Sequence, residues 1–154
     1  MTKTLQMNNG LKVPSLAFGM YKIPNETAKA TVMQAIEAGY RHFDTASYYE
    51  NEEGLGQGLQ EMFQTTTKKQ PLSREDVFIC TKVWNDVQKQ GRKAVRKSFF
   101  QSLKYLQLDY LDLFLIHWPV PGFHVETYKE LELLCQEGKL RSIGISNYSQ
   151  KVRF

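Results

Sequence analysis

The sequence has no hydrophobic run long enough to cross a membrane. Its longest apolar stretch, residues 110–116, is interrupted by Asp112 and is far shorter than a bilayer requires. Residues 1–10 also lack the apolar core of a secretory signal peptide. We therefore expect a soluble, cytoplasmic protein that has no membrane partner.

Cysteine is scarce, and neither sign of charge dominates. Cys80 and Cys135 are far apart and lack the paired spacing of a metal site or a redox motif, so we expect two reduced, packed thiols. The net charge of +4 is compatible with an anionic ligand such as a phosphorylated cofactor, but it is too small to predict nucleic-acid binding. A basic run could bind phosphate, although a solvated helix face is the favoured interpretation; it consists of Lys89, Arg92, Lys93, Arg96 and Lys97.

Strand-like and helix-like patterns alternate along the chain. Asn9 and Gly10 separate two short strand-like runs, and this pair supplies the positive φ angles of a tight hairpin. Each gap between the later strand-like runs holds an amphipathic helix pattern. The five predicted strands that follow the hairpin are residues 15–18, 40–44, 77–82, 111–117 and 141–146.

The limits of the predicted helices carry their own signals. Asn25 precedes the first helix pattern and is a candidate N-cap, because its side chain can accept a hydrogen bond from a free backbone N–H. Gly39 ends the first pattern and Gly138 ends the last, as glycine tolerates the left-handed conformation that closes many helices.

Strands that alternate with helices at this spacing pair in parallel through right-handed crossovers, so the sequence predicts an α/β fold. Two architectures are compatible with five such units. One is a complete doubly wound sheet of flavodoxin type, for which 154 residues is a natural length. The other is the first part of a (β/α)8 TIM barrel, which normally takes about 250 residues. Periodicity alone does not separate them.

Polar side chains stand at or just past the C-terminal end of every predicted strand. Loops at this end of parallel strands can vary while the strands fix the side-chain positions, and barrel enzymes carry their active sites there. The agreement of five strand ends is stronger evidence than any single residue and favours the barrel. These residues are Tyr21, Asp44, Tyr49, Lys82, His117, Ser146 and Asn147.

Four segments carry a resemblance to a known family. They are residues 43–52 (FDTASYYENE), 81–84 (TKVW), 113–119 (LFLIHWP) and 138–147 (GKLRSIGISN). In this combination and order, the chain resembles the aldo-keto reductases. The resemblance implies a TIM barrel that reduces small-molecule aldehydes or ketones to alcohols with NADPH, which the family binds without a Rossmann fold.

The resemblance assigns catalytic roles to four residues. A carbonyl that accepts a hydride develops negative charge on its oxygen, so a proton donor must stand beside it, and Tyr49 matches the family's donor. A phenol has a reference pKa of about 10, which a nearby ammonium lowers, and Lys82 matches that position. Asp44 would hold Lys82 in its charged form. His117 would orient the carbonyl and stabilise the developing oxyanion.

Each of these residues, taken alone, also has a simpler explanation. Asp44 could cap the segment that follows it, and Tyr49 could be a half-buried packing residue. Lys82 could be a surface lysine at a strand end, and His117 a satisfied core histidine. Their combination with the family motifs is what favours the catalytic interpretation.

The resemblance also predicts the binding surfaces. Ser146 and Asn147 match the pair that hydrogen-bonds the nicotinamide carboxamide in the family, although such a pair is also a good helix cap. Asp44 belongs to the cofactor-binding set as well as to the catalytic one. Tyr21 and Trp118 match aromatic walls of the substrate pocket; the alternative is packing under the loops.

Two other patterns are excluded as sites. Gly54, Gly56 and Gly58 lie within a helix pattern and lack both the spacing and the strand-to-helix turn of a dinucleotide fingerprint. Because a helical glycine costs about 1 kcal/mol relative to alanine, these glycines predict a soft helix. Asp109 and Asp112 flank a strand start at the end opposite the predicted site, so they do not form a glycosidase pair.

Residues 1–154 are expected to form a single, partial oxidoreductase domain. The resemblance implies three further barrel strands and a cofactor-phosphate site beyond the fifth strand. An open barrel exposes its edges and apolar interior, which favours self-association. Two functions of different class therefore stay open. One is an NADPH-dependent oxidoreductase; the other is a catalytically inactive fragment or partner-binding subunit that lacks the phosphate site.

Overall fold

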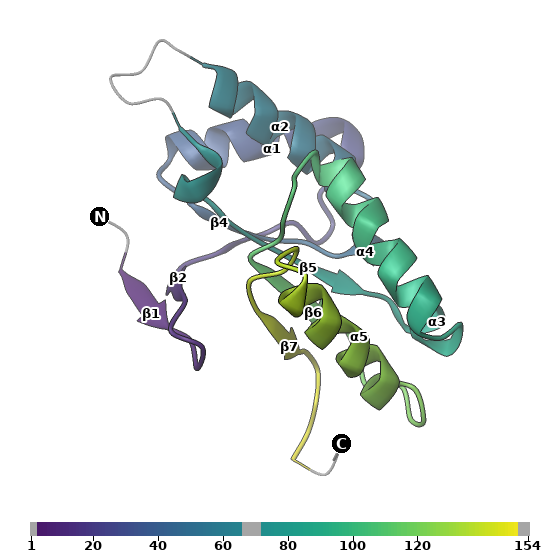
Figure 1. The fold of residues 1–154 in the computed structure, drawn as a ribbon. Coiled ribbons are helices and arrows are strands. Elements are labelled where there is room, and N and C mark those ends of the chain that lie inside the picture. Colours follow the sequence, from purple (N-terminus) through teal and green to yellow (C-terminus); the bar gives the residue numbers. More distant parts are fainter. Residues whose placement is uncertain (1–2, 66–71, 151–154) are drawn as a thin grey trace.

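The main element of the fold is a five-stranded parallel sheet (Figure 1). The computed structural model describes residues 3–65 and 72–150. The strands lie side by side in the order in which they occur along the chain, and each is parallel to the next. They are β3 (Phe18–Gly19), β4 (His42–Asp44), β5 (Phe78–Val83), β6 (Leu113–Ile116) and β7 (Ile143–Ile145).

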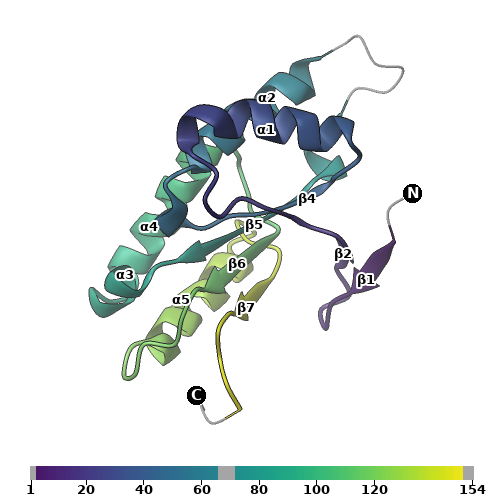
Figure 2. The same ribbon diagram turned by 180° about the vertical axis from the view of Figure 1, so that it is seen from behind.

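Helices connect these strands and cover one face of the sheet, and Figure 2 shows β5 and β6 from the other face. The apolar helix faces predicted from the sequence are buried there. No helix in the described ranges is long and apolar enough to cross a membrane. The helices are α1 (Asn25–Glu37), α2 (Glu52–Gln64), α3 (Asn85–Lys89), α4 (Arg92–Leu106) and α5 (His124–Gln136), with 3-10 turns η1 (Ser47–Tyr49) and η2 (Arg74–Asp76).

The strand order decides between the two predicted architectures. A doubly wound sheet of flavodoxin type has the order 2-1-3-4-5. The observed order is β3-β4-β5-β6-β7, which is that of successive strands in an opened barrel. The barrel prediction is therefore confirmed, and the doubly wound alternative is wrong.

The predicted N-terminal hairpin is present as β1 (Thr4–Gln6) paired antiparallel with β2 (Lys12–Pro14). Gly10 has the expected positive φ, +84°. The Asn9 amide donates a hydrogen bond to the Arg141 carbonyl oxygen (3.0 Å), and the His42 ring contacts the Pro14 carbonyl oxygen (3.1 Å). Since Arg141 precedes β7 and His42 begins β4, the hairpin lies under the N-terminal ends of the barrel strands.

The barrel strands have different limits from the predicted runs. The first run, residues 15–18, contributes only its last residue to β3. The Ser15 amide instead donates to the Lys3 carbonyl oxygen (2.9 Å), so this residue continues the hairpin ladder. The other strands begin one or two residues later than predicted, and β5 ends one residue later, at Val83. Hydrophobic runs mark the buried segment, whereas strand limits depend on pairing.

One predicted helix cap is wrong, and both predicted stops are confirmed. Asn25 is the first residue of α1, with Pro24 in the cap position. Its side-chain oxygen accepts a hydrogen bond from the Gly54 amide (2.9 Å), so Asn25 satisfies the first turn of α2. Gly39 and Gly138 follow the ends of α1 and α5 with φ of +101° and +72°.

The glycines of α2 lie where three helices pack together. A Cβ atom at Gly54 or Gly58 would collide with the backbone of α1, and one at Gly56 would collide with the Tyr105 carbonyl oxygen of α4. The sequence-based interpretation of a soft helix considered only intrinsic propensity. The structure shows that the missing side chains allow α1 and α4 to approach α2 closely.

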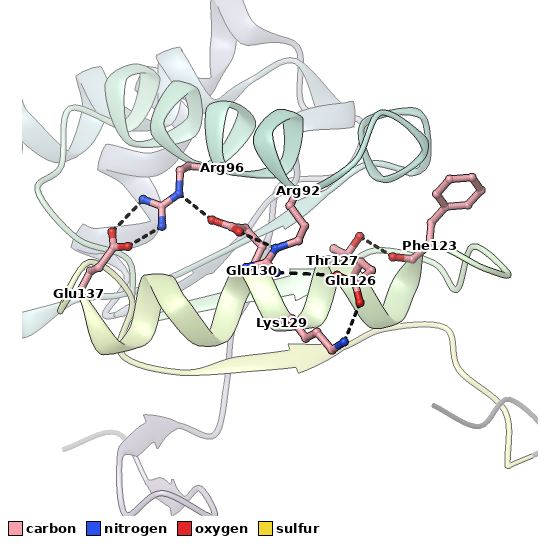
Figure 3. A network of polar contacts seen from close by, with 8 residues as sticks. All are labelled: Arg92, Arg96, Phe123, Glu126, Thr127, Lys129, Glu130 and Glu137. Atoms are coloured by element: carbon pink, nitrogen blue, oxygen red, sulfur yellow. Dashed lines mark hydrogen bonds and ion pairs between the residues drawn. The ribbon is translucent and has the colours of Figure 1, made fainter.

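The predicted basic run, which spans the end of α3 and the first half of α4, is a solvated face only in part. Glu130 of α5, which is buried, accepts hydrogen bonds from Arg92 (3.0 Å) and Arg96 (2.6 Å), as Figure 3 shows. Arg96 also pairs with Glu137 through two bonds. These ion pairs raise the pKa of the Arg96 guanidinium and join α4 to α5. Lys93 of the same run is exposed.

Candidate active site

The predicted catalytic residues meet at the C-terminal rim of the sheet. Asp44 ends β4, Lys82 is the penultimate residue of β5, and His117 follows β6 directly. Because the strands are parallel and adjacent, their C-terminal ends lie at one edge. Tyr49 ends the 3-10 turn η1, which leaves the same edge after β4.

A short ion pair joins two of these residues. The Lys82 ammonium lies 2.6 Å from the Asp44 carboxylate and donates a second hydrogen bond to the Thr45 carbonyl oxygen (2.8 Å). Lys82 is only 5% exposed, so these two oxygen partners replace the water that its ammonium would otherwise bind. The prediction that Lys82 and Asp44 lie within salt-bridge reach is confirmed.

Tyr49 and His117 stand on the same side of the sheet as the ion pair, as predicted. The Lys82 ammonium lies 5.2 Å from the centre of the Tyr49 ring, and the Tyr49 and His117 rings pack edge to face at 5.6 Å. Lys82 gives its hydrogen bonds to Asp44 and Thr45, so in this arrangement it faces the Tyr49 ring without bonding to the hydroxyl.

The His117 imidazole is neutral at ordinary pH. Burial and, to a smaller extent, the nearby charge of Lys82 lower its pKa to about 4, although Asp44 partly opposes both effects. Its buried Nδ1 atom has no hydrogen-bond partner among the described residues. A neutral imidazole carries one N–H, so it can donate one hydrogen bond to a ligand oxygen without a positive charge.

An open pocket of about 400 Å³ lies over this cluster. Tyr21 and Trp118, the predicted aromatic walls, line this pocket, and the Tyr21 ring lies 5.0 Å from the Tyr49 ring. Tyr48 and Trp84 also line the pocket, although the sequence analysis did not assign them to it. Trp84 follows β5 directly, so its position just past a strand end could have identified it as a pocket residue.

These two aromatic residues form a stack against the cluster. The Tyr48 and Trp84 rings are nearly parallel at 3.8 Å, and Trp84 packs edge to face on His117 at 5.0 Å. The stack therefore fixes one side of the His117 ring and places an apolar wall beside it. Such walls exclude water and strengthen electrostatic interactions inside a site.

Ser146 and Asn147 follow β7 at the same C-terminal edge of the sheet. The Asn147 amide nitrogen donates to the His117 carbonyl oxygen (2.8 Å) and to the Ser146 hydroxyl (3.1 Å). Asn147 lines the pocket, and its side-chain oxygen accepts no hydrogen bond from the described part of the chain. This oxygen and the Ser146 hydroxyl are suited to a ligand amide. Within residues 3–65 and 72–150, no group of His, Cys, Asp and Glu side chains is arranged to hold a metal ion.

Comparison with known proteins identifies the family. The sequence profile described as "Aldo/keto reductase family" matches residues 15–152. Methylglyoxal reductase DkgA of Salmonella typhimurium is 43% identical and glyoxal reductase of Bacillus subtilis is 42% identical, each over 146 residues. Each alignment covers 94% of this chain and 49% of the relative, so the chain spans about half the length of these relatives.

Solved structures agree with this result. An aldo/keto reductase from Brucella melitensis matches with a TM-score of 0.87 and 39% identity, over 97% of this chain and 56% of that one. An aldo-keto reductase of Bombyx mori, solved in complex with NADP, matches with a TM-score of 0.83 and 36% identity, over 94% and 50%. The hairpin, the five parallel strands and the helices that connect them correspond to part of a TIM barrel. The chain belongs to the aldo/keto reductase family.

Proposed function

We propose that this chain carries the catalytic half of an NADPH-dependent reductase of small aldehydes and ketones. The observation behind the proposal is that Tyr49 and a neutral His117 line one pocket, with the Lys82–Asp44 ion pair beside the Tyr49 ring. The names of the relatives support the substrate class, since they include reductases of glyoxal and methylglyoxal.

Proton transfer to the carbonyl oxygen is assigned to Tyr49. Reduction leaves negative charge on this oxygen, and a hydroxyl within reach can supply the proton that neutralises it. The ammonium of Lys82 stands beside the phenol ring and favours the phenolate that remains after transfer. Asp44 holds the ammonium in place, so its charge stays on the same side of the ring.

His117 is assigned to the carbonyl oxygen before and during proton transfer. Because its pKa is lowered to about 4, the ring is neutral at pH 7 and donates through a single N–H. A neutral donor stabilises the developing oxyanion without competing with Tyr49 as an acid. The edge-to-face contact with Trp84 keeps the ring plane fixed.

The nicotinamide end of the cofactor is assigned to Ser146 and Asn147, with Asp44 beside it. When bound, NADPH supplies the hydride that reduces the carbonyl carbon. The unengaged side-chain oxygen of Asn147 and the Ser146 hydroxyl match the donors and acceptor of a carboxamide. In the family, the cofactor phosphates are held largely by segments beyond the fifth barrel strand.

A second candidate follows from the length comparison. The chain spans about half of its curated relatives, so on its own it could lack the contacts that hold NADPH and serve as an inactive or partner-binding subunit. We expect very weak NADPH binding by the isolated 154-residue chain. A micromolar or tighter dissociation constant in a cofactor-fluorescence titration would contradict this expectation.

A chimera tests the catalytic proposal separately. Residues 1–147 of this chain would replace the matching half of the Bacillus subtilis glyoxal reductase, which supplies the remaining barrel. We expect the chimera to consume NADPH with methylglyoxal and with an aromatic aldehyde. A chimera that folds and binds NADPH, yet reduces neither compound, would refute the proposed function.

A further inference from the structure

We propose that the buried side chain of Asn51 is a positioning residue that sets where the Tyr49 hydroxyl and the Tyr21 ring stand in the pocket. This inference rests on the proposed function, because it concerns the geometry of the proton donor. Asn51 touches neither the pocket nor the ion pair. It acts through Thr45 and through the turn at residues 20–23.

Every polar atom of the Asn51 side chain is engaged. The residue is 0% exposed, and its amide oxygen accepts a hydrogen bond from the Thr45 hydroxyl (2.7 Å). Its amide nitrogen donates to the carbonyl oxygens of Met20 and Ile23, both at 2.8 Å. Because those two partners can only accept, the orientation of the amide is unambiguous. One side chain thus joins three separate points of the chain.

The bond to Thr45 closes the loop that carries Tyr49. Thr45 follows β4, Asn51 precedes α2, and Tyr49 lies between them in η1. Within the loop, the Tyr49 amide donates to the Ala46 carbonyl oxygen (2.9 Å), and Glu50 adopts a left-handed φ of 55°. A side-chain bond across the base of so tight a loop restricts where the phenol can point.

The two bonds to carbonyl oxygens hold the turn that carries Tyr21. Met20 and Ile23 are also joined by a backbone hydrogen bond (3.1 Å), and Lys22 within the turn has a left-handed φ of 64°. Tyr21 lies at the tip, with its ring 5.0 Å from the Tyr49 ring. Through these bonds, Asn51 restricts the position of the turn that carries Tyr21 as well as that of the loop that carries Tyr49.

Thr45 extends the arrangement to the ion pair. Its carbonyl oxygen accepts the second hydrogen bond of the Lys82 ammonium (2.8 Å), and its amide donates to the Cys80 carbonyl oxygen (2.9 Å). The hydroxyl of the same residue bonds to Asn51. A shift of Thr45 would consequently move the Tyr49 loop and the ammonium together.

Ser102 offers a matched control. Its buried hydroxyl donates to the carboxylate of Glu52, the residue after Asn51 (3.1 Å). No hydrogen bond joins this hydroxyl to the Tyr49 loop or to the Tyr21 turn within the described residues. Thr45→Val and Ser102→Ala each remove one buried hydroxyl bond, but only the first breaks the contact that closes the loop.

The test compares these variants in the chimera. We expect Thr45→Val to lower kcat by roughly tenfold to a hundredfold, since small misplacements of a reacting group have effects of this size. The KM for NADPH should stay unchanged, Thr45→Ser should restore kcat, and Ser102→Ala should leave kcat as in the parent. Equal kcat losses in Thr45→Val and Ser102→Ala, or no loss in Thr45→Val, would overturn the proposal.

Fluorine NMR gives a readout that does not depend on turnover. In 3-fluorotyrosine-labelled chimera, the resonances of Tyr49 and Tyr21, assigned by their Phe variants, should shift or broaden in Thr45→Val and not in Ser102→Ala. Unchanged resonances would refute the positioning role, whether or not the parent chimera is active. An inactive parent chimera would count against the proposed function alone. If Thr45→Val does not fold, Thr45→Cys replaces it. Because a thiol is a weaker donor than a hydroxyl, kcat should fall below that of Thr45→Ser, and an equal kcat would overturn the proposal.

Discussion

Each end of the five-stranded sheet carries a cluster of charged residues, and the two clusters differ in how far their carboxylate is enclosed. At the N-terminal ends, Asp112 is 0% exposed. It accepts hydrogen bonds from Arg74 (2.7 Å), Arg141 (2.8 Å) and the Ile79 amide (2.9 Å). The Tyr110 ring covers both guanidinium groups.

The cluster at the C-terminal ends is open by comparison. The Asp44 side chain is 35% exposed, the buried His117 Nδ1 has no partner among the described residues, and a pocket lies above them. A closed set of partners supports stability, because every buried charge is compensated within the protein. A half-exposed carboxylate beside a pocket is more accessible to a ligand. The sheet thus separates a structural cluster from the proposed catalytic one.

Replacing one tyrosine by phenylalanine at each end of the sheet should produce the largest difference in turnover. Tyr49→Phe removes the proposed proton donor, and we expect chimera turnover to fall roughly a hundredfold or more, with NADPH binding nearly unchanged. Tyr110→Phe, which keeps the ring over Arg74 and Arg141, should leave turnover as in the parent. Steady-state reduction of an aromatic aldehyde measures both. If Tyr49→Phe kept more than roughly a tenth of the turnover, the donor would be another residue, with His117 the next candidate.

The second contrast concerns stability. Asp112→Asn leaves Arg74 and Arg141 without their shared carboxylate, and breaking a buried ion pair in this way should lower the free energy of unfolding by about 3 kcal/mol. Turnover per folded molecule should not change. Asp109→Asn is the matched control, because this neighbouring carboxylate is exposed and should contribute less than about 0.5 kcal/mol. Urea unfolding of the chimera measures the free energy of unfolding of both variants. Equal losses in the two variants would mean that Asp112 does not hold together the cluster at the N-terminal ends of the strands.

The separation of the two ends was visible in the sequence. The alternation of strand and helix patterns predicts parallel strands, and parallel strands place Asp44, Lys82 and His117 at one edge whatever the exact strand limits are. The strand order was also within reach, since the polar strand ends favour the barrel over the doubly wound sheet. The alternation of strand and helix patterns and the polar residues at the strand ends therefore predict the same fold.

What the sequence could not supply is the set of contacts made across distant loops. Asn51 and Thr45 are ordinary polar residues in a motif, and nothing in their spacing indicates that Asn51 reaches the carbonyl oxygens of residues 20–23. The glycines of α2 similarly depend on which helices approach them. Arg92 and Arg96 look like a solvated face until α5 places Glu130 beside them. These features depend on tertiary packing, which the hydrophobic periodicity of the sequence does not indicate.

The open cluster should also respond to pH through His117. Burial and the charge of Lys82 lower the pKa of His117 to about 4, whereas the unfolded chain should titrate near the ordinary value of 6.5. Between these values the unfolded state binds the additional proton, so the stability contributed by neutral His117 is present above about pH 6.5 and is lost as pH falls toward 4.

Lys82→Met removes the second of these causes and leaves the Asp44 carboxylate without its ammonium partner, so it should raise the pKa of His117. NMR titration of the ring resonances, with the three histidines assigned by substitution, measures the shift in the parent chimera and the variant. Lys89→Met, which removes an exposed lysine paired with Asp86, is the control and should leave the titration unchanged. A parent pKa at or above 6.5, or no rise in Lys82→Met, would show that the ammonium does not act on the His117 ring, and the neutral-donor role assigned to it would then fail.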